Sequence, residues 1–103
     1  MRIMLACAFG MSTGMLVERM REAAAAQGKD VKIWAVDVES VDKNQDEFDI
    51  LLLGPQVSYL AEEMKKKYDA QVPVAVIKPV DYGRMNGAAV LKYAEGLLEE
   101  RKQ

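Results

Sequence analysis

The sequence predicts an α/β fold with three layers, in which helices cover both faces of a four-stranded parallel sheet of strand order 2-1-3-4. Strand-like apolar runs alternate along the chain with segments of helical periodicity, which is the pattern of β-α-β units. The runs at 2–7, 48–53 and 73–77 are almost wholly apolar, as expected for parallel strands covered on both faces. The run at 31–36 is more amphipathic, which favours an edge position, and right-handed crossovers then give the order 2-1-3-4.

The first strand and helix are defined by clear stop and start signals. Residues 2–7 form a short apolar run that ends at a glycine-bearing loop. A helix is predicted over 12–27, where Leu16 and Met20 share one side. Ser12 is a natural N-cap for this helix, and Gly28 is a natural stop.

The second strand, predicted over 31–36, carries the β-formers Val31, Ile33, Trp34 and Val36. Residues 38–47 are polar and acidic and form a connection with a short helical turn. This connection must cross from strand 2 to the far side of strand 1, which explains its length. The third strand, predicted over 48–53, is closed by Gly54-Pro55.

The last third of the chain contains two further helices. A helix is predicted from apolar residues at helical spacing, namely Val57, Leu60, Ala61, Met64 and Tyr68. Pro73 opens the fourth strand, which runs to Ile77, and residues 79–86 are predicted to be a loop. Asn86 can cap a final helix, whose inner face is Ala89, Val90, Ala94, Leu97 and Leu98.

Composition excludes several classes of function. The 103 residues are expected to form a single domain, 1–103, with a net charge of −2. Residues 65–67 are the only basic run, and a solvated helix face explains them better than nucleic-acid binding. With no histidine and one cysteine, a conventional zinc site is not expected, and no metal or cofactor is predicted.

The chain carries no signal for export or membrane insertion. The N-terminus has no long apolar region with a cleavage site, and the uncharged apolar stretch 50–54 is too short to span a bilayer. One cysteine cannot form an internal disulfide, which fits a reducing compartment. We therefore expect a cytoplasmic protein.

Cys7 is the strongest candidate for chemistry. A lone cysteine is usually a small buried hydrophobe, but Cys7 ends a strand and begins a glycine-bearing loop that opens into a helix. Backbone N–H groups and the positive helix end in such a loop favour a bound anion. The same field favours the thiolate, the reactive form of cysteine.

The topology brings two more loops to Cys7. Ligands of open α/β sheets gather beyond the carboxyl ends of the strands, at the point where strand order reverses. Here the loops 7–13, 54–58 and 78–87 meet at that point. Gln56 can donate an amide N–H to a phosphoryl oxygen or cap the second helix. Tyr82 can hydrogen-bond across the site or stack on the loop.

Three motifs occur in order along the chain. The first is Cys7-x-x-Gly10-Met11-Ser12-Thr13. The second is Leu52-Leu53-Gly54-Pro55-Gln56-Val57-x-Tyr59, and the third is Tyr82-Gly83-x-x-x-Gly87-x-x-Val90-Leu91-Lys92. Together they resemble the lactose/cellobiose/chitobiose class of enzyme IIB components of the bacterial sugar phosphotransferase system, and the first resembles that family's phosphocysteine loop.

The resemblance implies a phosphoryl carrier. Cys7 would take a phosphoryl group from a phosphohistidine of the IIA protein and pass it to a cellobiose-, chitobiose- or lactose-like sugar brought by the membrane IIC permease. The protein would associate with the inner membrane only peripherally, through IIC. The implied phosphate-binding residues are Ala8, Phe9, Gly10, Met11, Ser12 and Thr13, with Gln56 and Tyr82 as accessory residues. Ser12 and Thr13 can equally serve as helix caps.

The chain departs from the family pattern at Ala8, Phe9 and Gly14, and two other classes compete with the resemblance. Low-molecular-weight tyrosine phosphatases share the strand, cysteine loop and helix, but they place a phosphate-binding arginine where this chain has Thr13. A flavodoxin-like response module needs acidic residues where this chain has Cys7 and Gly54. The predicted fold is thus flavodoxin-like, or low-molecular-weight tyrosine phosphatase-like, and the residues favour passing a phosphoryl group onward.

Overall fold

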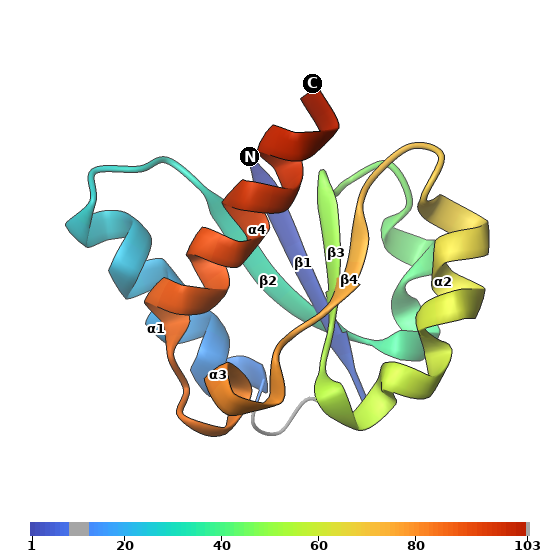
Figure 1. The fold of residues 1–103 in the computed structure, drawn as a ribbon, viewed down its shortest axis with the longest axis horizontal. Coiled ribbons are helices and arrows are strands. Elements are labelled where there is room, and N and C mark those ends of the chain that lie inside the picture. The colour runs from blue at the N-terminus through green and yellow to red at the C-terminus, as the bar shows by residue number, and fades with distance from the viewer. Residues whose placement is uncertain (9–12, 103) are drawn as a thin grey trace.

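The computed structural model describes residues 1–8 and 13–102 (Figure 1). Its strands are β1 (Arg2–Cys7), β2 (Lys32–Asp37), β3 (Ile50–Leu53) and β4 (Val74–Val76). Its α-helices are α1 (Thr13–Ala26), α2 (Ala61–Tyr68), α3 (Pro79–Gly83) and α4 (Gly87–Lys102). Short 3-10 helices occur at η1 (Val38–Ser40), η2 (Asp42–Asn44) and η3 (Pro55–Leu60).

The four strands form one parallel sheet of order β2-β1-β3-β4, which confirms the predicted topology. Leu5 lies opposite Ala35 of β2 and Leu52 of β3, so β1 is a central strand. The connection between β2 and β3 passes through η1 and η2, which matches the expected helical turn. All of the side chains from Ile3 to Cys7 are buried.

Alternate residues of the central strands enter two separate cores, as the pleat of a strand requires. One core lies between the sheet and helices α1 and α4, and the other lies between the sheet and α2 with the 3-10 helices (Figure 1). Ile3, Leu5, Ile50 and Leu52 belong to the first core. Met4, Ala6, Leu51 and Leu53 belong to the second. The strands are therefore apolar on both faces, which is why they read as continuous apolar runs.

The turn between α3 and α4 brings α4 into very close contact with α1. Asn86 caps α4 as predicted, because its Oδ1 accepts a hydrogen bond from the N–H of Ala89 at 3.1 Å. Gly87 follows directly and lies on the backbone of α1. A Cβ atom at Gly87 would lie 2.3 Å from the carbonyl carbon of Arg19 and 2.5 Å from the nitrogen of Met20. Only glycine permits this approach.

Three segments differ from the expectation. The helix predicted from Val57 to Tyr68 begins as the 3-10 helix η3, and α2 starts only at Ala61. Residues 79–83, predicted as part of a loop, form the short helix α3, because Pro79 suits a first helical turn and Tyr82 is buried in the core with α1 and α4. The third strand begins at Ile50 rather than at residue 48. Phe48 instead packs edge-to-face on Tyr68, with ring centroids 5.7 Å apart, on the α2 side of the sheet.

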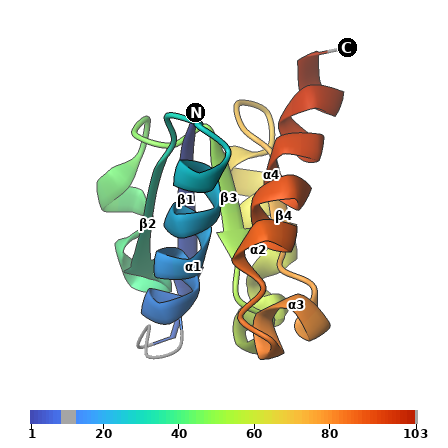
Figure 2. The ribbon, with the colours of Figure 1, turned by 90° about the vertical axis from the view of Figure 1, so that its left-hand side faces the viewer.

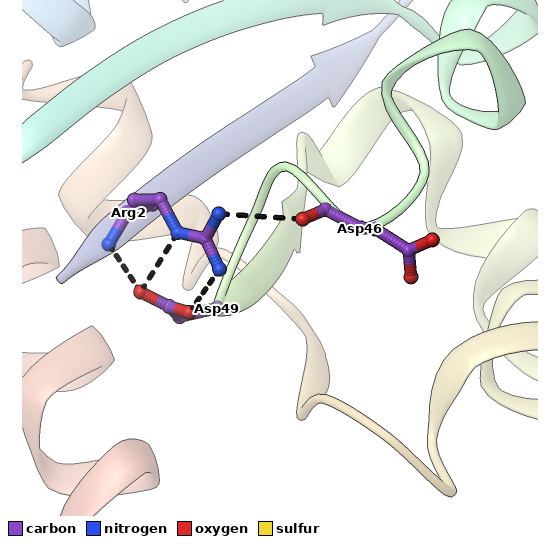
Figure 3. A network of polar contacts seen from close by, with 3 residues as sticks. All are labelled: Arg2, Asp46 and Asp49. Carbon is purple, nitrogen blue, oxygen red and sulfur yellow. Dashed lines mark hydrogen bonds and ion pairs between the residues drawn. The ribbon is translucent and has the colours of Figure 1, made fainter.

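The amino ends of β1 and β3 are joined by a charged network (Figure 3). The guanidinium of Arg2 donates to both carboxylate oxygens of Asp49, at 2.8 and 3.3 Å, and to the carbonyl oxygen of Asp46 at 3.3 Å. The backbone N–H of Arg2 also donates to Asp49, at 2.7 Å. The side-chain hydrogen bond from Arg2 holds the pKa of Asp49 below its ordinary value.

Candidate functional site

The candidate site lies at the carboxyl ends of the strands, opposite the charged network. Cys7 is the last residue of β1, and Thr13 is the first residue of α1. The segments η3 and α3 begin after β3 and β4 at the same end of the sheet (Figure 2). The structure therefore brings together the three loops that the strand order predicts to meet.

Cys7, Thr13 and Tyr82 form a buried chain of polar contacts. Thr13 Oγ1 donates a hydrogen bond to Cys7 Sγ at 2.8 Å. The same Oγ1 lies 3.1 Å from the phenol oxygen of Tyr82. Thr13 is fully buried, and the exposed fractions of Cys7 and Tyr82 are only 3% and 8%. In such low-dielectric surroundings a hydrogen bond is stronger than in water, and a donor aimed at the sulfur stabilises negative charge there.

Gly54 forms the wall of the site on the β3 side. Its N–H donates to the carbonyl oxygen of Ala6 at 2.9 Å, which continues the pairing of β1 and β3. A Cβ atom at Gly54 would lie 3.3 Å from Cys7 Cβ and 2.9 Å from Gln56 Oε1. Cys7 and the amide of Gln56 thus flank the same glycine. Gln56 itself is exposed, and neither η3 nor α2 has a side-chain N-cap hydrogen bond, so it does not act as the helix cap.

The predicted phosphate-binding residues of the loop run from Ala8 to Thr13. Ala8 is exposed. Phe9, Gly10, Met11 and Ser12 lie outside the described residues. Thr13 does more than begin a helix, because its hydroxyl contacts the sulfur.

The sequence places the loop that begins at Gly54 beside Cys7, as the structure confirms, but it assigns Gly54 no role in the site. Gly54 has φ −62° and ψ 149°, a conformation open to every residue type. A glycine is therefore needed here because a larger side chain would crowd Cys7 and Gln56. This crowding depends on how β1 and β3 pair with each other. In the sequence, this need for glycine is indicated only by its position directly after a buried strand.

Other candidate sites in the described part of the chain are weaker. A groove of about 520 Å³ opens at the amino ends of the strands between Pro73, Leu98 and Arg101, and no cysteine, serine or threonine lines it. Within residues 1–8 and 13–102, no cluster of three acidic, histidine or cysteine residues is placed to hold a metal ion. No helix in the same residues is long and apolar enough to cross a membrane.

Comparison with known proteins identifies the family of the chain. Residues 2–93 match the family model "PTS system, Lactose/Cellobiose specific IIB subunit". The galactose-specific EIIB component of Lactococcus lactis subsp. cremoris and the cellobiose-specific EIIB component of L. lactis subsp. lactis are each 47% identical to the chain. Each alignment covers 93% of this chain and 94% of the relative. The oligo-beta-mannoside-specific EIIB component of Bacillus subtilis is 37% identical, with 94% and 95% covered.

Solved structures show the same fold. The cellobiose-specific IIB component of Borrelia burgdorferi superposes with a TM-score of 0.81 at 33% identity, over 97% of this chain and 93% of that one. The lactose-specific IIB domain of Streptococcus pneumoniae gives a TM-score of 0.85 at 16% identity, over 94% and 96%, and supports the fold alone. The sequence relatives, the family model and the sheet order agree, and the chain belongs to the lactose/cellobiose-specific IIB family of the sugar phosphotransferase system, whose members are phosphotransferases.

Proposed function

We propose that the single domain 1–103 is a phosphoryl carrier and that Cys7 is its phosphorylated residue. The thiolate of Cys7 attacks the phosphorus of a phosphohistidine on the IIA protein. The S–P bond forms as the N–P bond breaks, and the imidazole keeps the electron pair. A sugar hydroxyl then forms a P–O bond and loses its proton to solvent, while the S–P electron pair returns to sulfur. The sugar, a cellobiose-, chitobiose- or lactose-like oligosaccharide, arrives through the membrane IIC permease.

One observation carries this proposal. The only cysteine of the chain ends the central strand β1, and a fully buried hydroxyl, that of Thr13, donates to its sulfur at 2.8 Å. A packing cysteine needs no such donor. A sulfur that alternates between thiolate and phosphothiol does, because negative charge returns to it when the phosphoryl group leaves.

Exposed apolar side chains around the site support protein partners. Met15, Tyr59 and Val80 are large hydrophobic residues with exposed fractions of 57%, 76% and 57%. They lie in the first turns of α1, in η3 and in α3, which are the segments that follow β1, β3 and β4. They therefore border the end of the sheet that carries Cys7, as a docking surface for IIA and IIC would require.

The residues do not favour hydrolysis. A tyrosine phosphatase holds its phosphate with an arginine at the position of Thr13. That position is fully buried here and holds a hydroxyl directed to sulfur. Position 13 thus supplies no guanidinium to a phosphoryl group, which suits transfer to a second partner.

The test is phosphorylation of the purified protein by enzyme I, the histidine carrier protein, the cognate IIA protein and phosphoenolpyruvate, read by intact mass. The wild type should gain one phosphate, and Cys7→Ser should gain none. Tyr93→Phe, a change on α4, serves as the matched control and should be phosphorylated like the wild type. Phosphorylation of Cys7→Ser would refute the assignment.

A further inference from the structure

The direction of the hydrogen bonds in the buried chain of polar contacts assigns a role to Tyr82. Thr13 Oγ1 carries a single proton, and that proton is donated to Cys7 Sγ. At 3.1 Å from the same oxygen, Tyr82 must then be the donor of the second contact. The order is therefore Tyr82 O–H to Thr13 Oγ1, and Thr13 O–H to Cys7 Sγ.

The direction of this chain depends on the state of the sulfur. A thiolate accepts only, so it requires Thr13 to donate and Tyr82 to donate behind it. A neutral thiol can instead donate to Thr13, which would turn the Thr13 proton toward Tyr82. When the phenol of Tyr82 donates to Thr13 Oγ1, the Thr13 proton points to the sulfur. This arrangement favours the thiolate, which can only accept.

We propose that Tyr82 is a positioning residue, which acts through Thr13 to hold Cys7 in the thiolate form that accepts and releases the phosphoryl group. This role rests on the proposed function, but it concerns the sulfur alone and can be measured without any partner. Tyr82 comes from α3 and Thr13 from α1, 69 residues apart in the chain. The packing of α3 therefore controls the reactivity of the residue at the end of β1.

The first test is the rate of alkylation by iodoacetamide as a function of pH, on the unphosphorylated protein. Thr13→Val should move the midpoint of the profile up by about one pH unit, since it removes a hydrogen bond to a charged acceptor. Tyr82→Phe should move the midpoint up by about half a pH unit, because the Thr13 hydroxyl remains but its proton is no longer oriented toward the sulfur. Thr13→Ser, which keeps the hydroxyl, should stay close to the wild type.

The double variant separates an action through Thr13 from any other action. If Tyr82 acts through Thr13, Tyr82→Phe should produce no further shift in the Thr13→Val background. The proposal would be overturned if Tyr82→Phe shifted the midpoint equally in the wild-type and Thr13→Val backgrounds. It would also be overturned if Tyr82→Phe caused no shift in the wild-type background. Tyr93→Phe removes a phenol oxygen from α4, keeps the ring that faces Lys78, and should leave the profile unchanged.

A measurement on the wild type guards against variants that fold poorly. The ¹³C resonance of the Tyr82 ring carbon bonded to oxygen should move at the same pH midpoint as the Cβ resonance of Cys7. A Tyr82 resonance that ignores the titration of Cys7 would also overturn the proposal. If the alkylation profiles and resonances behave as expected but the protein is not phosphorylated by the IIA protein, the carrier function alone would be refuted.

Discussion

Gly54→Ala should separate the stability of the fold from the reactivity of Cys7. The backbone of Gly54 is compatible with alanine, since its φ is −62° and its ψ is 149°. The new methyl group would lie 2.9 Å from Gln56 Oε1 and 3.3 Å from Cys7 Cβ. The first contact requires the exposed Gln56 side chain to rotate away, and the second requires Cys7 to move by a few tenths of an ångström.

Two opposing terms set the change in folding free energy. Alanine restricts the unfolded chain and stabilises by about 0.4–1 kcal/mol at a compatible backbone position. Extra volume in a packed site destabilises by about 1–3 kcal/mol. Because one of the two contacts is with a flexible side chain, we expect the low end of that range, about 1 kcal/mol, and therefore a net loss of at most about 0.5 kcal/mol. The rate should change more, because a misplacement of about 1 Å can slow a reaction by about 100-fold. A shift of a few tenths of an ångström, with Gln56 displaced, should slow phosphoryl transfer by about tenfold.

The assay is the single-turnover rate of phosphoryl transfer from labelled IIA protein, measured beside the free energy of unfolding in urea. Gly96→Ala is the matched control, because Gly96 lies in α4 with no atom within 4 Å of an added Cβ. It should stabilise the protein by about 1 kcal/mol and leave the transfer rate unchanged. A Gly54→Ala protein that transfers at the wild-type rate would show that the space beside Cys7 is not needed.

Two further predictions concern stability. Gly87→Ala should destabilise the protein by about 3 kcal/mol or more, because its methyl group would overlap the backbone of Arg19 and separate α1 from α4; an unchanged urea midpoint would contradict this close approach. Asp49→Asn should lower the free energy of unfolding at pH 7 by about 0.5 kcal/mol, allowing for partial exposure. Since Arg2 lowers the pKa of Asp49, this contribution is present above the unfolded value near pH 4 and is lost as the pH falls through the folded pKa, so the variant and the wild type should converge once the pH is below the folded pKa. A difference that persists there would show that the ion pair is not its source.

The sheet could be predicted from the sequence because strands that are buried on both faces are apolar at almost every position. The apolar runs of β1 and β3 and the amphipathic edge strand β2 were enough to order the strands. The helix α3 was missed because five residues carry little periodicity. Its stability comes from the burial of Tyr82 against α1 and α4, which only the tertiary structure provides.

The candidate site was predictable in part for a related reason. Cys7 and Thr13 lie at the junction of a strand and a helix, so local sequence placed both of them. The contact of Thr13 with Tyr82 joins residues 69 positions apart, and the relation of Gly54 to Cys7 depends on the register of β1 and β3. Such contacts follow from packing distances, which no local pattern encodes.

The positions of the chain ends have a practical consequence. Met1 precedes β1 and α4 ends the described chain, and both ends lie at the side of the sheet remote from Cys7 (Figure 1). A strand of six residues spans about 20 Å, so a fluorophore or an immobilising handle attached at either end would stand at least that far from the sulfur. The protein can therefore be anchored to a sensor surface with the Cys7 end of the sheet facing the solution, and binding of the proposed partners can be timed on one immobilised sample.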